Sequence, residues 1–248
     1  MNEPTGRFRA PAKLLLVSTA AVCALAAAVF ALRRGNSLLL GWTLVLLSLL
    51  PFLWRFERKE RQARELVLIA VMAAVASVSR VPFATLLPGF TPVTFIVIVS
   101  GAAFGAEAGW MVGALSALVS NFFLGQGPWT PWQMFAWGMA GLTAGWLTHR
   151  HPPMRRRLPL AALGAAWGFA YGWILDLTLA IDLWVREHSW ASVAGLYAAS
   201  ALFDAVHAAA NVLFLSVFGP GWIALLKRYR LKYGALQRER SVWERKEA

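Results

Sequence analysis

The sequence is poor in charge and almost free of cysteine, and each shortage narrows the kind of protein that it encodes. Charged residues make up 15% of the 248 residues, whereas a soluble globular domain carries about 25%. The single cysteine, Cys23, excludes an internal disulfide and a cysteine-based metal framework. We therefore expect neither a soluble domain nor a small fold held together by disulfides or metal.

Motifs that mark enzymes and pumps are also missing. None of the lysines follows a glycine, so the chain lacks the Gly-Lys-Ser/Thr phosphate loop. It also contains no His-Glu-x-x-His and no Gly-x-Ser-x-Gly. These absences argue against ATP hydrolysis by this chain alone and leave no catalytic or metal-binding constellation.

Apolar residues dominate what is present, at 58% of the chain. They gather in blocks of about 15 to 25 residues, roughly what a bilayer crossing requires. The first block lacks a clear cleavage site followed by a soluble domain, so we interpret it as a helix rather than a signal peptide. We expect an all-α integral membrane protein with eight spans, of which the fourth is short: Leu14–Leu32, Leu38–Trp54, Leu66–Val81, Val93–Phe104, Ala108–Leu124, Trp132–Leu147, Leu158–Ile181 and Ala194–Phe218.

The net charge of +12 follows the membrane topology. With eight spans and a cytoplasmic N-terminus, 20 of the 24 Lys and Arg residues fall on the cytoplasmic side. This positive-inside pattern predicts that both termini are cytoplasmic. Contact with anionic lipid accounts for the basic charge, so no nucleic-acid partner is needed. We expect a multi-pass protein of the cell membrane.

Composition divides the chain into three parts. Residues 1–64 hold a two-helix hairpin followed by a basic linker, residues 65–226 hold six spans, and residues 227–248 form a basic tail. The hairpin has no ionisable residue inside its spans, so we interpret it as an accessory anchor. We expect the last span to end at Gly219-Pro220-Gly221. Gly101, Gly105, Gly109 and Gly113 recur every fourth residue and predict a tight helical hairpin, because small residues let helices approach closely in lipid.

Polar side chains inside the predicted spans are few, and each marks a candidate site because burying ionisable groups in a bilayer is costly. Asp204, His207 and Asn211 are spaced to share one helix face. The other candidates lie in the fifth to seventh spans and in the loop after the fifth: Asn121, Gln126, Trp129, Trp132, Gln133, Trp137 and Asp176. In the expected topology the set predicts a Trp-lined polar cup that opens outward. The alternative is that Asp204 and His207 satisfy each other and only stabilise the bundle.

The stretch from Glu65 to about Leu226 resembles the substrate-binding S component of energy-coupling factor (ECF) vitamin transporters. The resemblance rests on six spans, the small Ala70/Ala74 face, the Gly-rich hairpin at Ser100–Gly109 and, above all, the run Val119–Phe135. That run is similar to the cobalamin-type subgroup. The resemblance implies capture of a vitamin from outside and association with a transmembrane coupling protein and two cytoplasmic ATPases. ATP is then used by those partners, and this chain holds no cofactor of its own.

The resemblance also implies that Ala70 and Ala74 contact the coupling protein and that the loop Pro82–Pro92, with Phe90, closes the pocket. The extra hairpin Leu14–Trp54 has no counterpart in the family pattern.

For the ligand we expect cobalamin or a related corrinoid. The tryptophans would supply aromatic surface, Gln126 and Gln133 would bind amides, and Asp176, Asp204 and His207 would accept donors. The alternatives are another micronutrient such as a queuosine precursor, an integral membrane enzyme using Asp204 and His207, and a membrane scaffold.

Overall fold

A computed structural model describes residues 23, 25–34, 36–56 and 63–232, and every helix or strand element in this part is helical. The expected all-α membrane fold is therefore confirmed. Parts of the first expected span, the linker and the tail (residues 14–22, 24, 57–62 and 233–248) lie outside the described residues. After a helical segment at 25–34 the elements are α2 (Ser37–Phe56), α3 (Ala63–Leu86), α4 (Val93–Phe104), α5 (Ala106–Leu124), α6 (Trp129–Arg150), the short 3₁₀ helix η1 (Pro152–Arg155), α7 (Arg157–Glu187) and α8 (Trp190–Arg230).

Four of these helices, α3, α5, α7 and α8, are long and apolar enough to cross a membrane. Two shorter apolar stretches are Leu38–Ser48 within α2 and the whole of α4. The helix expected as the short fourth span has the expected bounds, Val93–Phe104. Several long apolar helices in one chain support a multi-pass membrane protein.

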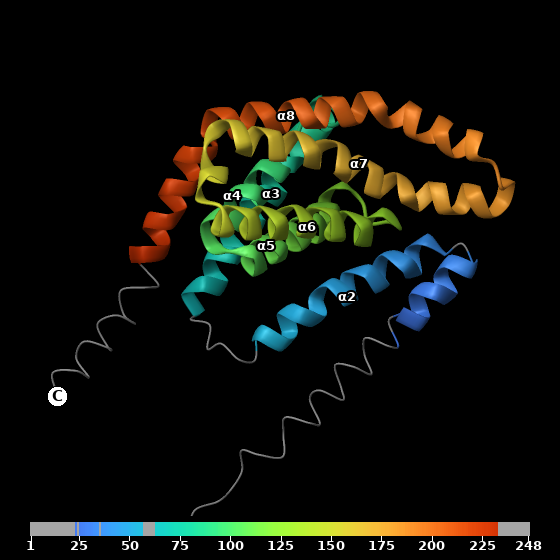
Figure 1. The fold of residues 1–248 in the computed structure, drawn as a ribbon, viewed down its shortest axis with the longest axis horizontal. Helices are drawn as coiled ribbons and strands as arrows, with labels where there is room; N and C mark the ends of the chain where they lie inside the picture. The colour runs from blue at the N-terminus through green and yellow to red at the C-terminus, as the bar shows by residue number, and fades with distance from the viewer. Residues whose placement is uncertain (1–22, 24, 35, 57–62, 233–248) are drawn as a thin grey trace, which may run out of the picture.

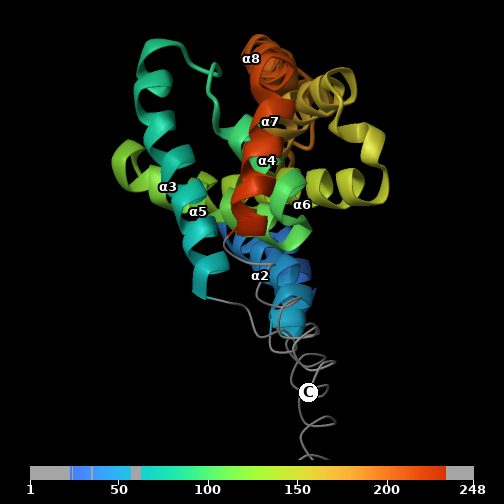
Figure 2. The ribbon, with the colours of Figure 1, turned by 90° about the vertical axis from the view of Figure 1, so that its left-hand side faces the viewer.

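The bundle is built around α4 (Figures 1 and 2). Every residue of α4 except Phe104 is buried, and α4 packs against α3, α5, α6, α7 and α8. A helix that is apolar all round belongs at such a position. The long α7 and α8 form an antiparallel pair on one side of it, α3 lies on another flank, and α2 lies along α6 on the side away from α8.

The Gly-rich hairpin is tighter than expected and involves a third helix. Only Gly105, with φ of 107°, separates α4 from α5. A Cβ on Gly109 would lie 2.6 Å from the Gly101 Cα and 2.4 Å from the Gly141 carbonyl oxygen. The glycines of α4 and α5 therefore let α6 approach as well, so that three helices meet backbone to backbone.

A second glycine row joins α7 to α8. Gly164, Gly168 and Gly172 recur every fourth residue on α7. Added Cβ atoms there would lie 2.4 Å from the Leu215 side chain, 2.3 Å from the Ala208 Cα and, at Gly172, against the Asp204 carboxylate. This row brings the polar face of α8 directly against α7.

Two predicted helix ends are wrong, and proline is the reason in both cases. α3 continues through Pro82 to Leu86, so the expected loop Pro82–Pro92 is helical over its first half. α8 continues through Pro220 to Arg230 and bends near its C-terminal end (Figure 1). Proline usually stops a helix in water, but membrane helices tolerate it with a kink.

The N-terminal hairpin packs on the six-helix part through α6 and α7. Trp132 of α6, which is 1% exposed, lies in a cluster with Ala28, Ala31 and Leu40 of the hairpin. A Cβ on Gly41 would lie 2.7 Å from the Trp132 indole nitrogen, so glycine permits this contact. In the described residues the hairpin is thus seated on the bundle.

Candidate functional site

The candidate site begins with Arg80, near the end of α3. Its Nη1 donates to the Ser120 hydroxyl and to the Asn121 side-chain oxygen on α5, both at 2.7 Å. Arg80 forms no ion pair with any described carboxylate. A guanidinium has five N–H donors, so Arg80 carries donor capacity beyond the two bonds from Nη1.

Asn121 extends this network to α6. Its amide nitrogen donates to the Thr130 hydroxyl and to the Gln133 side-chain oxygen, both at 2.9 Å. The Thr130 hydroxyl in turn donates to the Gln126 side-chain oxygen at 2.9 Å. Asn121, Thr130 and Gln133 are buried, and buried polar groups of this kind fix one arrangement when they are mutually hydrogen-bonded. The network orients the α5–α6 connection.

An aromatic stack adjoins the network. The Arg80 Cζ lies 4.8 Å from the ring centroid of Trp137, within cation–π range. Trp137 also stacks on Tyr171 of α7, with centroids 4.7 Å apart and planes 29° apart. Trp137 and Tyr171 are both buried. Three helices, α3, α6 and α7, thus contribute one cation and two rings to a compact group.

His207 of α8 completes the group. The Trp137 indole nitrogen donates to the Thr94 hydroxyl at 3.0 Å, and the same hydroxyl lies 2.9 Å from His207 Nε2. The His207 ring meets Tyr171 edge-on at 4.9 Å. Threonine on the central α4 therefore ties the aromatic stack to the polar face of α8. We call Arg80, Asn121, Gln133, Trp137, Tyr171 and His207 the central group.

Asp204 and Asn211 lie one turn on either side of His207. Asp204 is 0% exposed, and neither of its carboxylate oxygens has a hydrogen-bond partner among the described residues. The Asn211 amide nitrogen donates to the Gly164 carbonyl at 3.1 Å, while its side-chain oxygen has no partner. His207 Nδ1 is likewise unpartnered. Asp204 and His207 do not form an ion pair, so the interpretation that they merely satisfy each other is wrong.

The structure brings some of the sequence-predicted residues together and separates others. Asn121, Gln126, Gln133, Trp137 and His207 join one network. The rest lie outside its hydrogen bonds. Trp132 packs under the hairpin, Trp129 is 43% exposed beside Gly127, Asp176 accepts from Ser200, Asn211 donates to the Gly164 carbonyl, and Phe90 lies beside Phe83 and Phe214.

The sequence prediction missed Arg80, Thr94 and Tyr171. The charge distribution left Arg80 among the four Lys and Arg residues on the outer side of the membrane. Its ionisable side chain at the end of an otherwise apolar run was nevertheless a signal, because charged groups at membrane depth usually face the protein interior. Nothing in the sequence distinguished Thr94 or Tyr171 from ordinary span residues.

The sequence matches one family of known proteins. The family model described as the ECF-type riboflavin transporter S component matches residues 61–218. The chain belongs to this family. No curated protein and no solved structure gives a significant match. The cobalamin-type subgroup is not confirmed by the family match and stays a prediction.

As an ECF S component the chain is a substrate-binding subunit of a membrane transporter and not an enzyme. Such components bind vitamin-like substrates and work with a membrane coupling protein and ATPases. The predicted transport class is therefore confirmed, and the enzyme alternative is set aside. The matched range begins at the charged linker, so the N-terminal hairpin lies outside it.

Proposed function

We propose that this S component captures a flat heteroaromatic vitamin of the riboflavin class at the outer side of the membrane. The observation that carries the proposal is the stack of Arg80, Trp137 and Tyr171 joined to the Asn121–Gln133 amides. The name of the matched family points to the same ligand class. ATP-driven release into the cell then depends on the partner subunits.

The chemistry of the central group suits such a ligand. A planar ring system gains most from stacking on a buried aromatic face, which Trp137 and Tyr171 supply. The carbonyl edge of a flavin ring accepts hydrogen bonds, and a guanidinium gives strong, charge-assisted ones. The amides of Asn121 and Gln133 offer both donors and acceptors. In the structure these groups bond one another, so a ligand would replace those bonds as it enters.

Cobalamin remains the second candidate. It is favoured by Trp129, which is 43% exposed, and by the exposed Gln126 in the connection between α5 and α6. A corrinoid is wider than a flavin and carries several amides, which neutral side chains bind well. Against it, Trp132 lies under the N-terminal hairpin and is not available to a large ligand.

We also propose the orientation and the partner surface. The end of the bundle formed by the α5–α6 and α7–α8 connections would be the outer end, with both termini in the cytoplasm, as the distribution of Lys and Arg favours. Ala70 and Ala74 are exposed on α3, while Ala73 and Ala76 of the same helix are buried. A small exposed face on a membrane helix suits close packing against a helix of the coupling protein.

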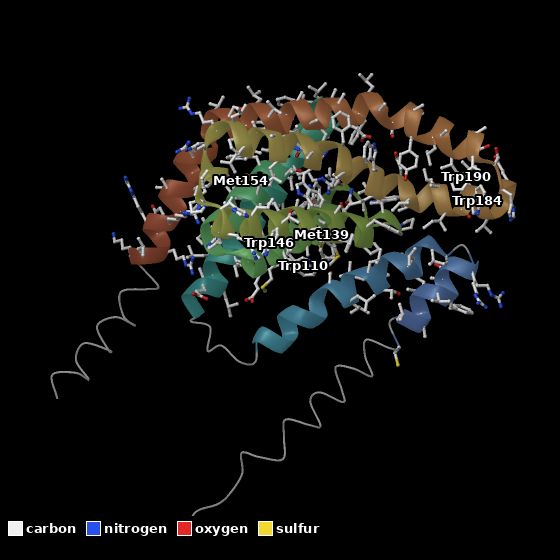
Figure 3. All side chains as sticks on the ribbon, viewed as in Figure 1. Trp110, Met139, Trp146, Met154, Trp184 and Trp190 are labelled. Atoms are coloured by element: carbon white, nitrogen blue, oxygen red, sulfur yellow. The ribbon has the colours of Figure 1, made fainter. Side chains whose placement is uncertain are left out.

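The test is a ligand-retention experiment on the detergent-purified full chain. The protein is incubated separately with riboflavin and with cobalamin, washed, and examined by absorbance spectroscopy and by mass analysis of the released ligand. Trp137→Leu removes the buried ring of the stack. Trp146→Leu is the matched control, because Trp146 lies on the same helix but is 53% exposed (Figure 3).

Stoichiometric riboflavin that is retained by the wild type and by Trp146→Leu, but lost from Trp137→Leu, is the expected result. Retention of cobalamin alone would replace the ligand and keep the fold and family. Retention of neither would refute both ligands and direct the mass analysis to whatever compound co-purifies, a queuosine precursor included.

A further inference from the structure

Asp204 has a setting that the binding of a flat ring does not explain. It is fully buried, and both of its oxygens lack hydrogen-bond partners. No cation of the described residues forms an ion pair with it. A carboxylate in such a position is costly, and a lone acceptor away from water favours any ligand group that donates a hydrogen bond.

The position of Asp204 relates it directly to the central group. Its carboxylate lies against the backbone of Gly172 on α7, the residue that follows Tyr171. On α8 it lies one turn from His207, whose ring contacts Tyr171. Along the contacts Arg80–Trp137–Tyr171, Arg80 is at one end and Asp204 is beside the other. The site therefore has a donor cation at one end and an acceptor anion at the other.

A second acidic side chain reinforces the negative end. Asp176 lies one turn beyond Gly172 on α7 and accepts a hydrogen bond from Ser200, which lies one turn beyond Asp204 on α8. The connection between α3 and α4 covers the same region, because a Cβ on Gly89 would lie 3.0 Å from the Phe203 carbonyl oxygen. Of these two carboxylates on facing turns, Asp176 is half-buried and Asp204 is enclosed by protein, where solvent screens it weakly.

We infer that Asp204 makes this S component selective for a neutral, hydroxyl-bearing vitamin over its phosphate ester. This inference rests on the proposed riboflavin-class function. A hydroxylated side chain directed toward Asp204 donates to a carboxylate that otherwise lacks a partner. A phosphate at the same place brings like charges together in a weakly screened site, and such a repulsive element is how a binding site rejects a close analogue.

The test compares riboflavin with flavin mononucleotide, its phosphate ester, by fluorescence titration of the detergent-purified full chain. The wild type is compared with Asp204→Asn, which removes the charge and keeps the shape, and with Asp204→Ser. Asp182→Asn is the matched control, because it removes one negative charge near the α7–α8 connection, but from an exposed pair with Arg186.

The wild type is expected to bind riboflavin at least about tenfold more tightly than the phosphate ester, given the cost of juxtaposed like charges. In Asp204→Asn riboflavin affinity falls and ester affinity rises, so the ratio shrinks by about tenfold on the same grounds. Asp182→Asn keeps the wild-type ratio.

Equal affinities of the wild type for the two flavins would overturn the inference without any variant. So would an unchanged ratio in Asp204→Asn and Asp204→Ser, while riboflavin binding by the wild type upholds the proposed function. A wild type that binds neither flavin refutes the proposed function and the inference together, and is thereby distinguished from the first two results.

Discussion

Replacing Gly141 by alanine is the sharpest test of the seam between α4, α5 and α6. A Cβ at this position would lie 2.1 Å from the Gly109 carbonyl oxygen and 2.3 Å from its carbonyl carbon. Both are backbone atoms in a helix, so neither can rotate away. Because real Cβ atoms essentially never approach closer than 3.0 Å, α5 and α6 would have to separate by roughly 1 Å, as overpacking of a close-packed interior requires.

The size of the effect follows from that displacement. Overpacking a core by one methyl group typically costs about 1–3 kcal/mol. For a chain of this size that corresponds to a fall in Tm of about 2–12 °C, taking about 2–4 °C for each kcal/mol. The upper half of this range is expected, because neighbouring contacts of the same seam, at Gly109 and Gly113, would loosen with it.

The assay is thermal unfolding in detergent, followed by tryptophan fluorescence and by the loss of the monodisperse peak in size-exclusion chromatography. Gly195→Ala is the matched control, because nothing lies within 4 Å of a Cβ at that helical position. Alanine there should raise stability slightly, since glycine inside a helix costs about 0.5–1 kcal/mol relative to alanine. A Gly141→Ala protein as stable as Gly195→Ala would refute the reasoning about the seam.

Three further predictions concern the ligand, the partner and the hairpin. Arg80→Gln should weaken riboflavin binding by about tenfold or more, because a hydrogen bond to a charged group contributes about 1.5–3 kcal/mol; an unchanged titration would exclude Arg80 from the site. Ala74→Leu should abolish co-purification with the coupling protein while riboflavin still binds. Val75→Leu, at an exposed neighbour, should leave co-purification intact. Equal co-purification of the two variants would exclude the Ala70/Ala74 face as the contact. Gly41→Leu should lift the hairpin from Trp132 and expose that indole to a brominated detergent, which quenches tryptophan fluorescence. Quenching no stronger than in the wild type would contradict the packing of the hairpin on Trp132.

Much of the fold follows from local signals in the sequence. Helix α4 has the predicted bounds, Val93 and Phe104: Pro92 precedes the helix, and Gly105, which adopts a positive φ, follows it. The end of α8 was not predicted, since Gly219-Pro220-Gly221 normally stops a helix in water but only bends one in this bundle. In a membrane protein, glycine and proline therefore indicate that a helix exists more reliably than they locate its end.

The candidate site was predicted less well, because tertiary packing decides which side chains meet. Trp132 and Trp137 lie five residues apart on α6 and look alike in the sequence. Trp137 stacks on Tyr171, while Trp132 turns to the hairpin. The hairpin has no ionisable residue in its spans that would indicate this contact. The contact depends instead on small residues such as Gly41, whose missing side chain leaves room for the Trp132 indole.

The length of α7 makes one residue a reporter for the topology of the whole chain. At about 1.5 Å per residue, its 31 residues exceed the hydrocarbon thickness of about 30 Å. Trp184 and Trp190, whose rings lie 4.3 Å apart at the tip of the α7–α8 pair (Figure 3), are of the type that anchors at the interface. The intervening Ser189 should therefore reach water on one side only. After Cys23 is replaced by serine, Ser189→Cys leaves a single cysteine in the chain. Whether a membrane-impermeant maleimide labels it on intact cells then fixes the orientation of every helix in the membrane.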